Sequence, residues 1–201
     1  MRKKLSALAA LALIMAVVAS PSAAHAALSA NLSQVINAGT LSVDFVDGSN
    51  VAIASPSVSF GAVNYSFSCQ DGTATLGTAT QKLQVKNPKK AGVKIDLNAS
   101  VPATDKWTSG TDNYKYNGSA CTDGQLTVSD GTFTKTAGAG TPTYTMPGGA
   151  FSGATSVTLF SNTGNVAYNA DLTAYTLTQK IPAEQAAGTY ALPMVVTYIA
   201  Q

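Results

Sequence analysis

The sequence repeats one pattern along most of its length: short runs of alternating apolar and polar residues, separated by turn-forming residues. The clearest runs are residues 41–45, 58–60, 63–67, 82–85, 93–97, 125–128, 157–160, 175–177 and 190–199. A period of two places one face of each run on a core and the other in water, which is typical of β-strands. Dipeptides that favour tight turns lie between the runs, at Asp47-Gly48, Asp71-Gly72, Asn117-Gly118, Asp123-Gly124 and Asp130-Gly131.

Sustained helical periodicity is missing from the same region. The one candidate for a helical turn is residues 183–187, between Pro182 and Gly188. Residues 138–153, with two prolines and several glycines, predict a long loop or a hairpin excursion. We therefore expect an all-β fold, a single antiparallel β-sandwich of the immunoglobulin-like or jelly-roll-like kind.

The first 26 residues have the features of a secretory signal peptide. Arg2, Lys3 and Lys4 are followed by an apolar run, residues 5–18, and by the small-x-small sequence at 24–26. We expect a signal-peptide helix over residues 1–26 and a single domain over residues 27–201, secreted to the extracellular cell surface. The apolar run is too short for an ordinary membrane span, and no later segment approaches about 20 continuous apolar residues.

Removing that segment changes the chemistry available to the protein. The only histidine, His25, and the only arginine, Arg2, lie within it. The rest of the chain has nine lysines and ten acidic residues, for a net charge of −1. A nearly neutral chain without arginine is a poor candidate for binding nucleic acid. Without histidine the usual catalytic triads are excluded. We expect no enzymatic activity, no cofactor and no metal site. The sequence leaves open one alternative, a calcium ion bound by ligands from separated loops.

Cys69 and Cys121 predict a disulfide, because exported proteins usually meet an oxidising environment. The alternative is a pair of free redox thiols, but their separation lacks the Cys-x-x-Cys spacing that lowers a thiol pKa.

Three further features are candidates for contact with partners, and each also has a purely structural explanation. Five lysines, which lie close together in the sequence, could contact an anionic polymer or could protect an exposed hairpin from edge pairing: Lys82, Lys86, Lys89, Lys90 and Lys94. Trp107, Tyr114 and Tyr116 could stack on sugar rings or peptide groups, or could fill the core. The C-terminal run, residues 190–199, could close the sandwich or extend the sheet of a neighbouring copy, as could residues 28–45.

Two short motifs resemble those of WxL-domain-like bacterial surface proteins. Leu76-Gly77-Thr78 and Leu83-Gln84-Val85 precede Gly92-Val93-Lys94-Ile95, where Val93 stands in place of the signature tryptophan. The ending from Ile181-Pro182-Ala183 to Gly188-Thr189-Tyr190 is also similar. This resemblance implies a β-sandwich attached to peptidoglycan.

A second resemblance is to spore-coat-U-like and archaic pilus subunits. It rests on Val58-Ser59-Phe60-Gly61, on the cysteine pair and on the same ending. It implies fibres that are built by strand exchange.

The sequence therefore predicts an exported, non-enzymatic protein of the cell envelope. One form is a wall-associated or surface-interaction protein that binds a cell-wall polymer or another surface protein, as in adhesion. The alternative is a structural, self-assembling subunit of a pilus, a fibre or a surface layer that uses terminal-strand exchange.

Overall fold

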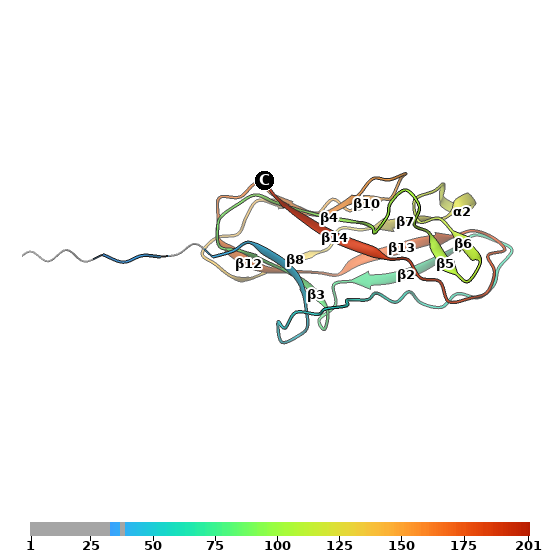
Figure 1. Ribbon diagram of the computed structural model, residues 1–201, viewed down its shortest axis with the longest axis horizontal. Coiled ribbons are helices and arrows are strands. Elements are labelled where there is room, and N and C mark those ends of the chain that lie inside the picture. The colour runs from blue at the N-terminus through green and yellow to red at the C-terminus, as the bar shows by residue number, and fades with distance from the viewer. Residues whose placement is uncertain (1–32, 37–38) are drawn as a thin grey trace, which may run out of the picture. The chain divides into compact units, whose positions relative to one another are not determined.

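The computed structural model describes residues 33–36 and 39–201, so the expected signal peptide lies outside the described residues. From Gly39 onward the described residues belong to one compact unit, and it is built almost entirely of antiparallel strands (Figure 1). The longer strands are β1 (Ser42–Val46), β2 (Gln70–Leu76), β3 (Lys82–Asn87), β4 (Val93–Ala99), β7 (Gln125–Val128), β8 (Thr132–Ala137), β11 (Val157–Asn162), β12 (Tyr168–Thr173), β13 (Tyr175–Ile181) and β14 (Met194–Ala200). The short elements are β5 (Trp107–Ser109), β6 (Asp112–Tyr114), β9 (Tyr144–Thr145), β10 (Gly149–Ala150) and the helix α2 (Ala120–Asp123). The predicted all-β sandwich is confirmed.

The first layer of the sandwich consists of two sheets that continue into each other. One sheet has the order β1-β3-β12-β8, and the other has the order β10-β7-β13-β2. β12 runs into β13 through Ala174 alone, and β2 is joined to β3 by residues 77–81, so the same neighbours pair along both halves. The result is one long antiparallel layer with a bend between its two sheets.

The bend has a local backbone cause. Ala174 has a φ of 60°, and its N–H donates a hydrogen bond of 2.7 Å to the carbonyl oxygen of Gly77. Gly77 itself has a φ of 82°, and a Cβ added there would lie 2.7 Å from the Cα of Thr173. Glycine is therefore required at position 77, where this segment closely approaches the backbone of Thr173.

The second layer has the order β14-β4-β11-β9, and the core fills the space between the layers. Alternate residues of β4 and β12 point inward, as the geometry of a strand requires. The largest fully buried side chains include Tyr116, Tyr168, Tyr175, Phe151 and Phe160. A bulge between Thr158 and Phe160 shifts the register of β11 against β4.

Several local predictions are wrong. Residues 58–60 and 63–67 join no sheet, whereas β2, β8 and β12 form where no strand was expected. Asp71-Gly72 lies inside β2 instead of in a turn, because Asp71 pairs with Lys180 of β13 and Gly72 lies against the Ile181 side chain. Tertiary packing overrides turn propensity there.

The expected turn at Asp47-Gly48 is present, and the N–H of Asn50 donates to the carbonyl oxygen of Asp47, but other expected turns differ. Asp130-Gly131 connects β7 to β8 without forming a hairpin, since these strands pair with β13 and β12. Among the described residues, the helix is α2 and not residues 183–187. No helix in the described ranges has the length and hydropathy of a membrane span.

Candidate functional site

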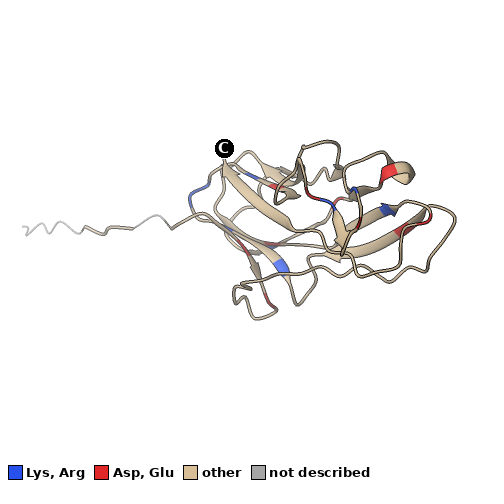
Figure 2. Ribbon diagram, turned by 45° about the vertical axis from the view of Figure 1, so that its right-hand side comes forward, with Lys and Arg blue, Asp and Glu red and all other residues tan. Residues whose placement is uncertain are grey.

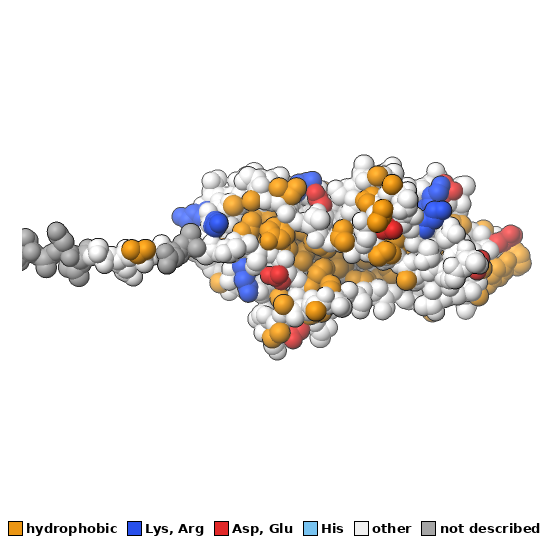
Figure 3. Space-filling model, viewed as in Figure 1, with side chains coloured by type: hydrophobic (Ala, Val, Ile, Leu, Met, Phe, Trp, Pro, Cys, Tyr) orange, Lys and Arg blue, Asp and Glu red, His pale blue; other side chains and the backbone are white. Residues whose placement is uncertain are grey.

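The edges of the two layers do not meet on the side of the sandwich where β14 lies. There β14 is the edge of the second layer, while β1 and β2 are edges of the first. Between them lies a cavity of about 630 Å³, which we call the edge groove. Its floor consists of core residues that are nearly inaccessible to solvent, namely Leu76, Leu83, Leu97, Leu126 and Leu177. Figure 3 shows hydrophobic side chains gathered in a hollow along this face.

The walls of the edge groove are half-buried apolar side chains. Val43 and Phe45 of β1, with Val58 and Phe60, form one wall. The opposite wall is formed by alternate residues of the C-terminal run, namely Leu192, Met194 and Val196. Fully buried floor residues beneath half-buried walls indicate that the groove is an unfilled section of the core.

The backbone of β14 offers hydrogen bonds at this groove. Ser100 donates to the carbonyl oxygen of Pro193, and Gln201 donates to that of Gly92, so odd-numbered residues of β14 bond to β4. Because bonded and non-bonded pairs alternate in an antiparallel ladder, the N–H groups of Met194, Val196 and Tyr198 point away from β4. The edge is therefore equipped to pair with a further strand.

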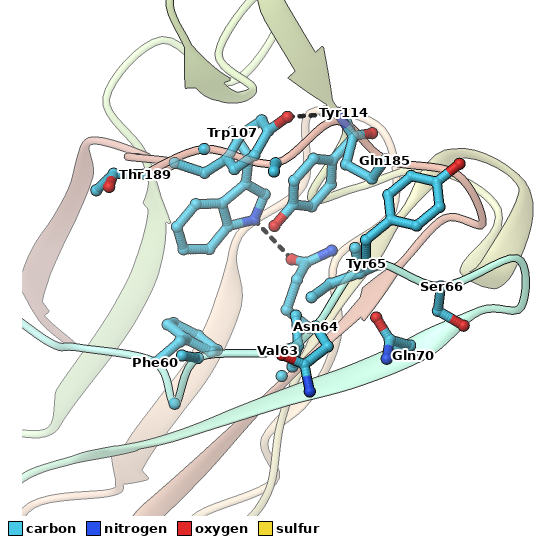
Figure 4. Close-up of a pocket in the computed structure, with 18 of the residues that line it drawn as sticks. Phe60, Val63, Asn64, Tyr65, Ser66, Gln70, Trp107, Tyr114, Gln185 and Thr189 are labelled. Carbon is cyan, nitrogen blue, oxygen red and sulfur yellow. Dashed lines mark hydrogen bonds between the residues drawn. The ribbon is translucent and has the colours of Figure 1, made fainter.

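A second cavity, of about 460 Å³, lies next to the edge groove and shares four lining residues with it, namely Val58, Phe60, Trp107 and Tyr190. We call it the aromatic pocket. Its walls are the unpaired segment at residues 58–66 and the loop at residues 182–190, and Trp107, Tyr114 and Gln179 complete it (Figure 4).

The rings in the aromatic pocket are held in fixed positions. Trp107 stacks on Tyr114 at a centroid distance of 6.1 Å and meets Phe60 edge-on at 5.2 Å. The indole Nε1 of Trp107 donates a 2.7 Å hydrogen bond to Oε1 of Gln179. Burial, and to a smaller degree the neighbouring Tyr190, raises the pKa of Tyr114 to about 12, so its phenol stays neutral at physiological pH.

The structure separates the three predicted aromatic residues. Trp107 and Tyr114 lie together in the aromatic pocket, but Tyr116 is fully buried against Phe151. The hydroxyl of Tyr116 donates to the carbonyl oxygen of Pro102. Tyr116 therefore packs in the core. The prediction that it contacts an external ligand is wrong.

The five lysines are also divided. Lys82 lies on β3 of the first layer and forms a 2.7 Å ion pair with Asp171, while Lys94 lies on β4 of the second layer and pairs with Asp96. Lys86, Lys89 and Lys90 are exposed at and beside the turn between β3 and β4. Figure 2 shows charged residues scattered over both layers. Of the five lysines that were candidates for contact with an anionic polymer, these three remain exposed and close together.

The predicted disulfide between Cys69 and Cys121 is confirmed, with a Cα–Cα distance of 5.3 Å. It links Cys69, which follows the unpaired segment directly before β2, to Cys121 in α2. In the part of the chain that the structure describes, no three His, Cys, Asp or Glu residues gather in a way that could hold a metal ion.

Sequence reasoning missed most of the aromatic pocket. Only Trp107 and Tyr114 were expected as contact residues, whereas Asn64 lies in a run predicted as a strand, Gln185 lies in the predicted helical turn, and no pattern marked Gln70. Comparison of the chain with protein-family models, with curated proteins and with solved structures gave no match.

Proposed function

We propose that the protein is an exported, non-enzymatic protein of the cell envelope, and that it is a self-assembling subunit whose edge groove accepts a strand from a second copy. The observation that carries this proposal is the edge groove itself, an apolar section of the core beside an edge strand with free backbone N–H groups. A strand added there would extend the ladder of β14 and cover the half-buried apolar walls of the groove.

The proposed donor is the segment that precedes β1 in the expected mature chain, residues 28–40. Leu28, Ala30 and Leu32 alternate with Ser29, Asn31 and Ser33, and the pattern is interrupted by Gln34 and Val35 before Ile36 returns to the parity of the leucines. A strand of nine residues spans roughly 30 Å, which is long enough to pair with all of β14. Burying each leucine or isoleucine contributes about 1.5–3 kcal/mol.

Part of the expected exchange segment has another role. Residues 42–46 form β1, which pairs with β3 in the first layer, so exchange is assigned only to the residues before it. Ile36 has the parity of the two leucines and is 85% exposed, so its side chain is available, whereas Val35, which is 84% exposed, has the parity of the serines.

The test compares two double variants of the chain that starts at Ala27. Leu28→Asp with Leu32→Asp places charge on the apolar face of the donor, and Ser29→Asp with Ser33→Asp places the same charge on its polar face. We expect the parent and the serine variant to form oligomers or fibres, and the leucine variant to remain monomeric, in sedimentation velocity and electron microscopy. The proposal is refuted if the parent is monomeric at all concentrations.

The wall-associated form remains the second candidate because Lys86, Lys89 and Lys90 gather around one turn. A monomeric parent that co-sediments with purified cell wall at low salt would support that form instead.

A further inference from the structure

The aromatic pocket has a lining that matches one class of ligand. No acidic or basic side chain lines it, although it is rich in carboxamides, hydroxyls and aromatic rings. A volume of about 460 Å³ falls in the ordinary range of small-molecule sites, about 300–1,000 Å³.

The polar groups of this pocket are available to a ligand. Asn64 is exposed and Gln70 is half-buried, and neither carboxamide has a hydrogen-bond partner among residues 33–36 and 39–201. Gln185 is used differently, because its Nε2 donates to the hydroxyl of Tyr190 at 2.7 Å. Figure 4 shows Asn64 on the wall opposite Trp107. A ligand in this pocket would meet an aromatic ring on one side and free amide groups on the other.

We propose that the aromatic pocket binds an uncharged saccharide. A sugar ring combines a C–H face, which packs on an aromatic ring, with hydroxyls at its edge that hydrogen-bond to carboxamides. A charged ligand would lose its hydration without gaining an ion pair. A purely apolar ligand would leave Asn64 and Gln70 desolvated and unpaired.

The pocket is preorganised for such binding. The hydrogen bond from Trp107 to Gln179 holds the indole, and Gln179 is itself 1% exposed and donates to the carbonyl oxygen of Lys180 at 2.7 Å. The disulfide at Cys69 restrains the adjoining wall. Fixed partners reduce the conformational entropy that binding would otherwise cost.

Trp107 is the only tryptophan of the chain, so its fluorescence reports on the aromatic pocket and on the adjoining end of the edge groove, which also contacts it. The probes are maltopentaose, cellopentaose and chitopentaose, with pentagalacturonate as the charged counterpart and a proline-rich peptide as the competing class. We expect a saturable fluorescence change with at least one neutral saccharide and none with pentagalacturonate.

Two variants assign the binding to the pocket. Asn64→Ala with Gln70→Ala should weaken the saccharide affinity about tenfold, through the loss of hydrogen bonds. Asn113→Ala, at an exposed carboxamide on β6 outside the pocket lining, should leave it unchanged.

The measurement is repeated in the Leu28→Asp, Leu32→Asp variant, so that assembly and saccharide binding are judged separately. The proposal is overturned if none of the neutral saccharides gives a saturable change at millimolar concentration, if only the peptide does, or if the two pocket substitutions leave the affinity unchanged.

Discussion

Asp171 illustrates how the charged residues of this protein act as parts of the fold. Its carboxylate accepts hydrogen bonds from Lys82 at 2.7 Å and from Gln84 at 3.2 Å. The Gln84 side chain also donates to Asn50, in the loop that follows β1. Only 10% of the Asp171 side chain and 14% of the Lys82 side chain are exposed. Lys82 is therefore part of a structural network on the outer face of the first layer. This differs from the role considered from the sequence, which was contact with an anionic polymer.

Replacing Asp171 with alanine should destabilise the protein by about 3 kcal/mol, because the Lys82 ammonium would remain largely buried without its partner. The matched control is Asp71→Ala, which removes a pair between Asp71 and Lys180 whose side chains are 48% and 38% exposed. That exposed pair should contribute only about 0–1 kcal/mol. Urea unfolding measures both changes. Equal losses in the two variants would contradict a structural role for Asp171.

At the scale of elements, the sequence predicts strands well where apolar and polar residues alternate along it. β1, β3, β4, β7 and β11 all coincide with predicted runs. β8 and β12 were not predicted because threonine, alanine and asparagine occupy many of their positions. Such residues give little contrast between apolar and polar positions. The segment at residues 58–67 alternates well but forms no ladder, since alternation cannot reveal whether a partner strand is present.

The candidate site depends on relations that a sequence pattern does not contain. The edge groove exists because β14 pairs with β4 on one side only, and that pairing joins residues about a hundred positions apart. The aromatic pocket brings together residues 58–66, 107–114 and 182–190 through long-range packing. Individual aromatic residues could be recognised as candidates, but their grouping follows from topology.

The direction of the free N–H groups on β14 leads to a prediction for this element. Val196→Pro removes an N–H that points toward the edge groove, whereas Thr197→Pro removes one that bonds to β4. We expect Thr197→Pro to cost about 1–3 kcal/mol more stability than Val196→Pro, because a ladder bond is lost. Urea unfolding compares the two.

Val196→Ala is the control for the side chain of Val196, which lines the groove. In sedimentation velocity, Val196→Pro should assemble less than Val196→Ala. Equal assembly of these two variants would argue against strand addition at β14.

At the scale of the whole molecule, one covalent link supports the part of the sandwich that has the fewest ladder bonds. Residues 61–69 are held by isolated backbone bonds, such as that from Gly61 to the Thr73 carbonyl oxygen, and by the disulfide at their end. Tyr65 and Phe67 on this segment are 55% and 77% exposed, so little burial stabilises it. The aromatic pocket depends on this wall, and its integrity is therefore coupled to the oxidation state of the two cysteines.

Reduction should thus lower both global stability and the order of the aromatic pocket. The cysteines are 52 residues apart, and the loop-closure relation gives a loss of about 4 kcal/mol in the free energy of unfolding. We expect dithiothreitol to lower the urea midpoint and to alter the fluorescence of Trp107 before global unfolding, because the wall facing it loosens first. Cys69→Ala with Cys121→Ala should reproduce the shift and should not respond further to the reductant. A midpoint that is the same with and without the disulfide would mean that packing alone holds the wall, and that the pocket does not depend on an oxidising compartment.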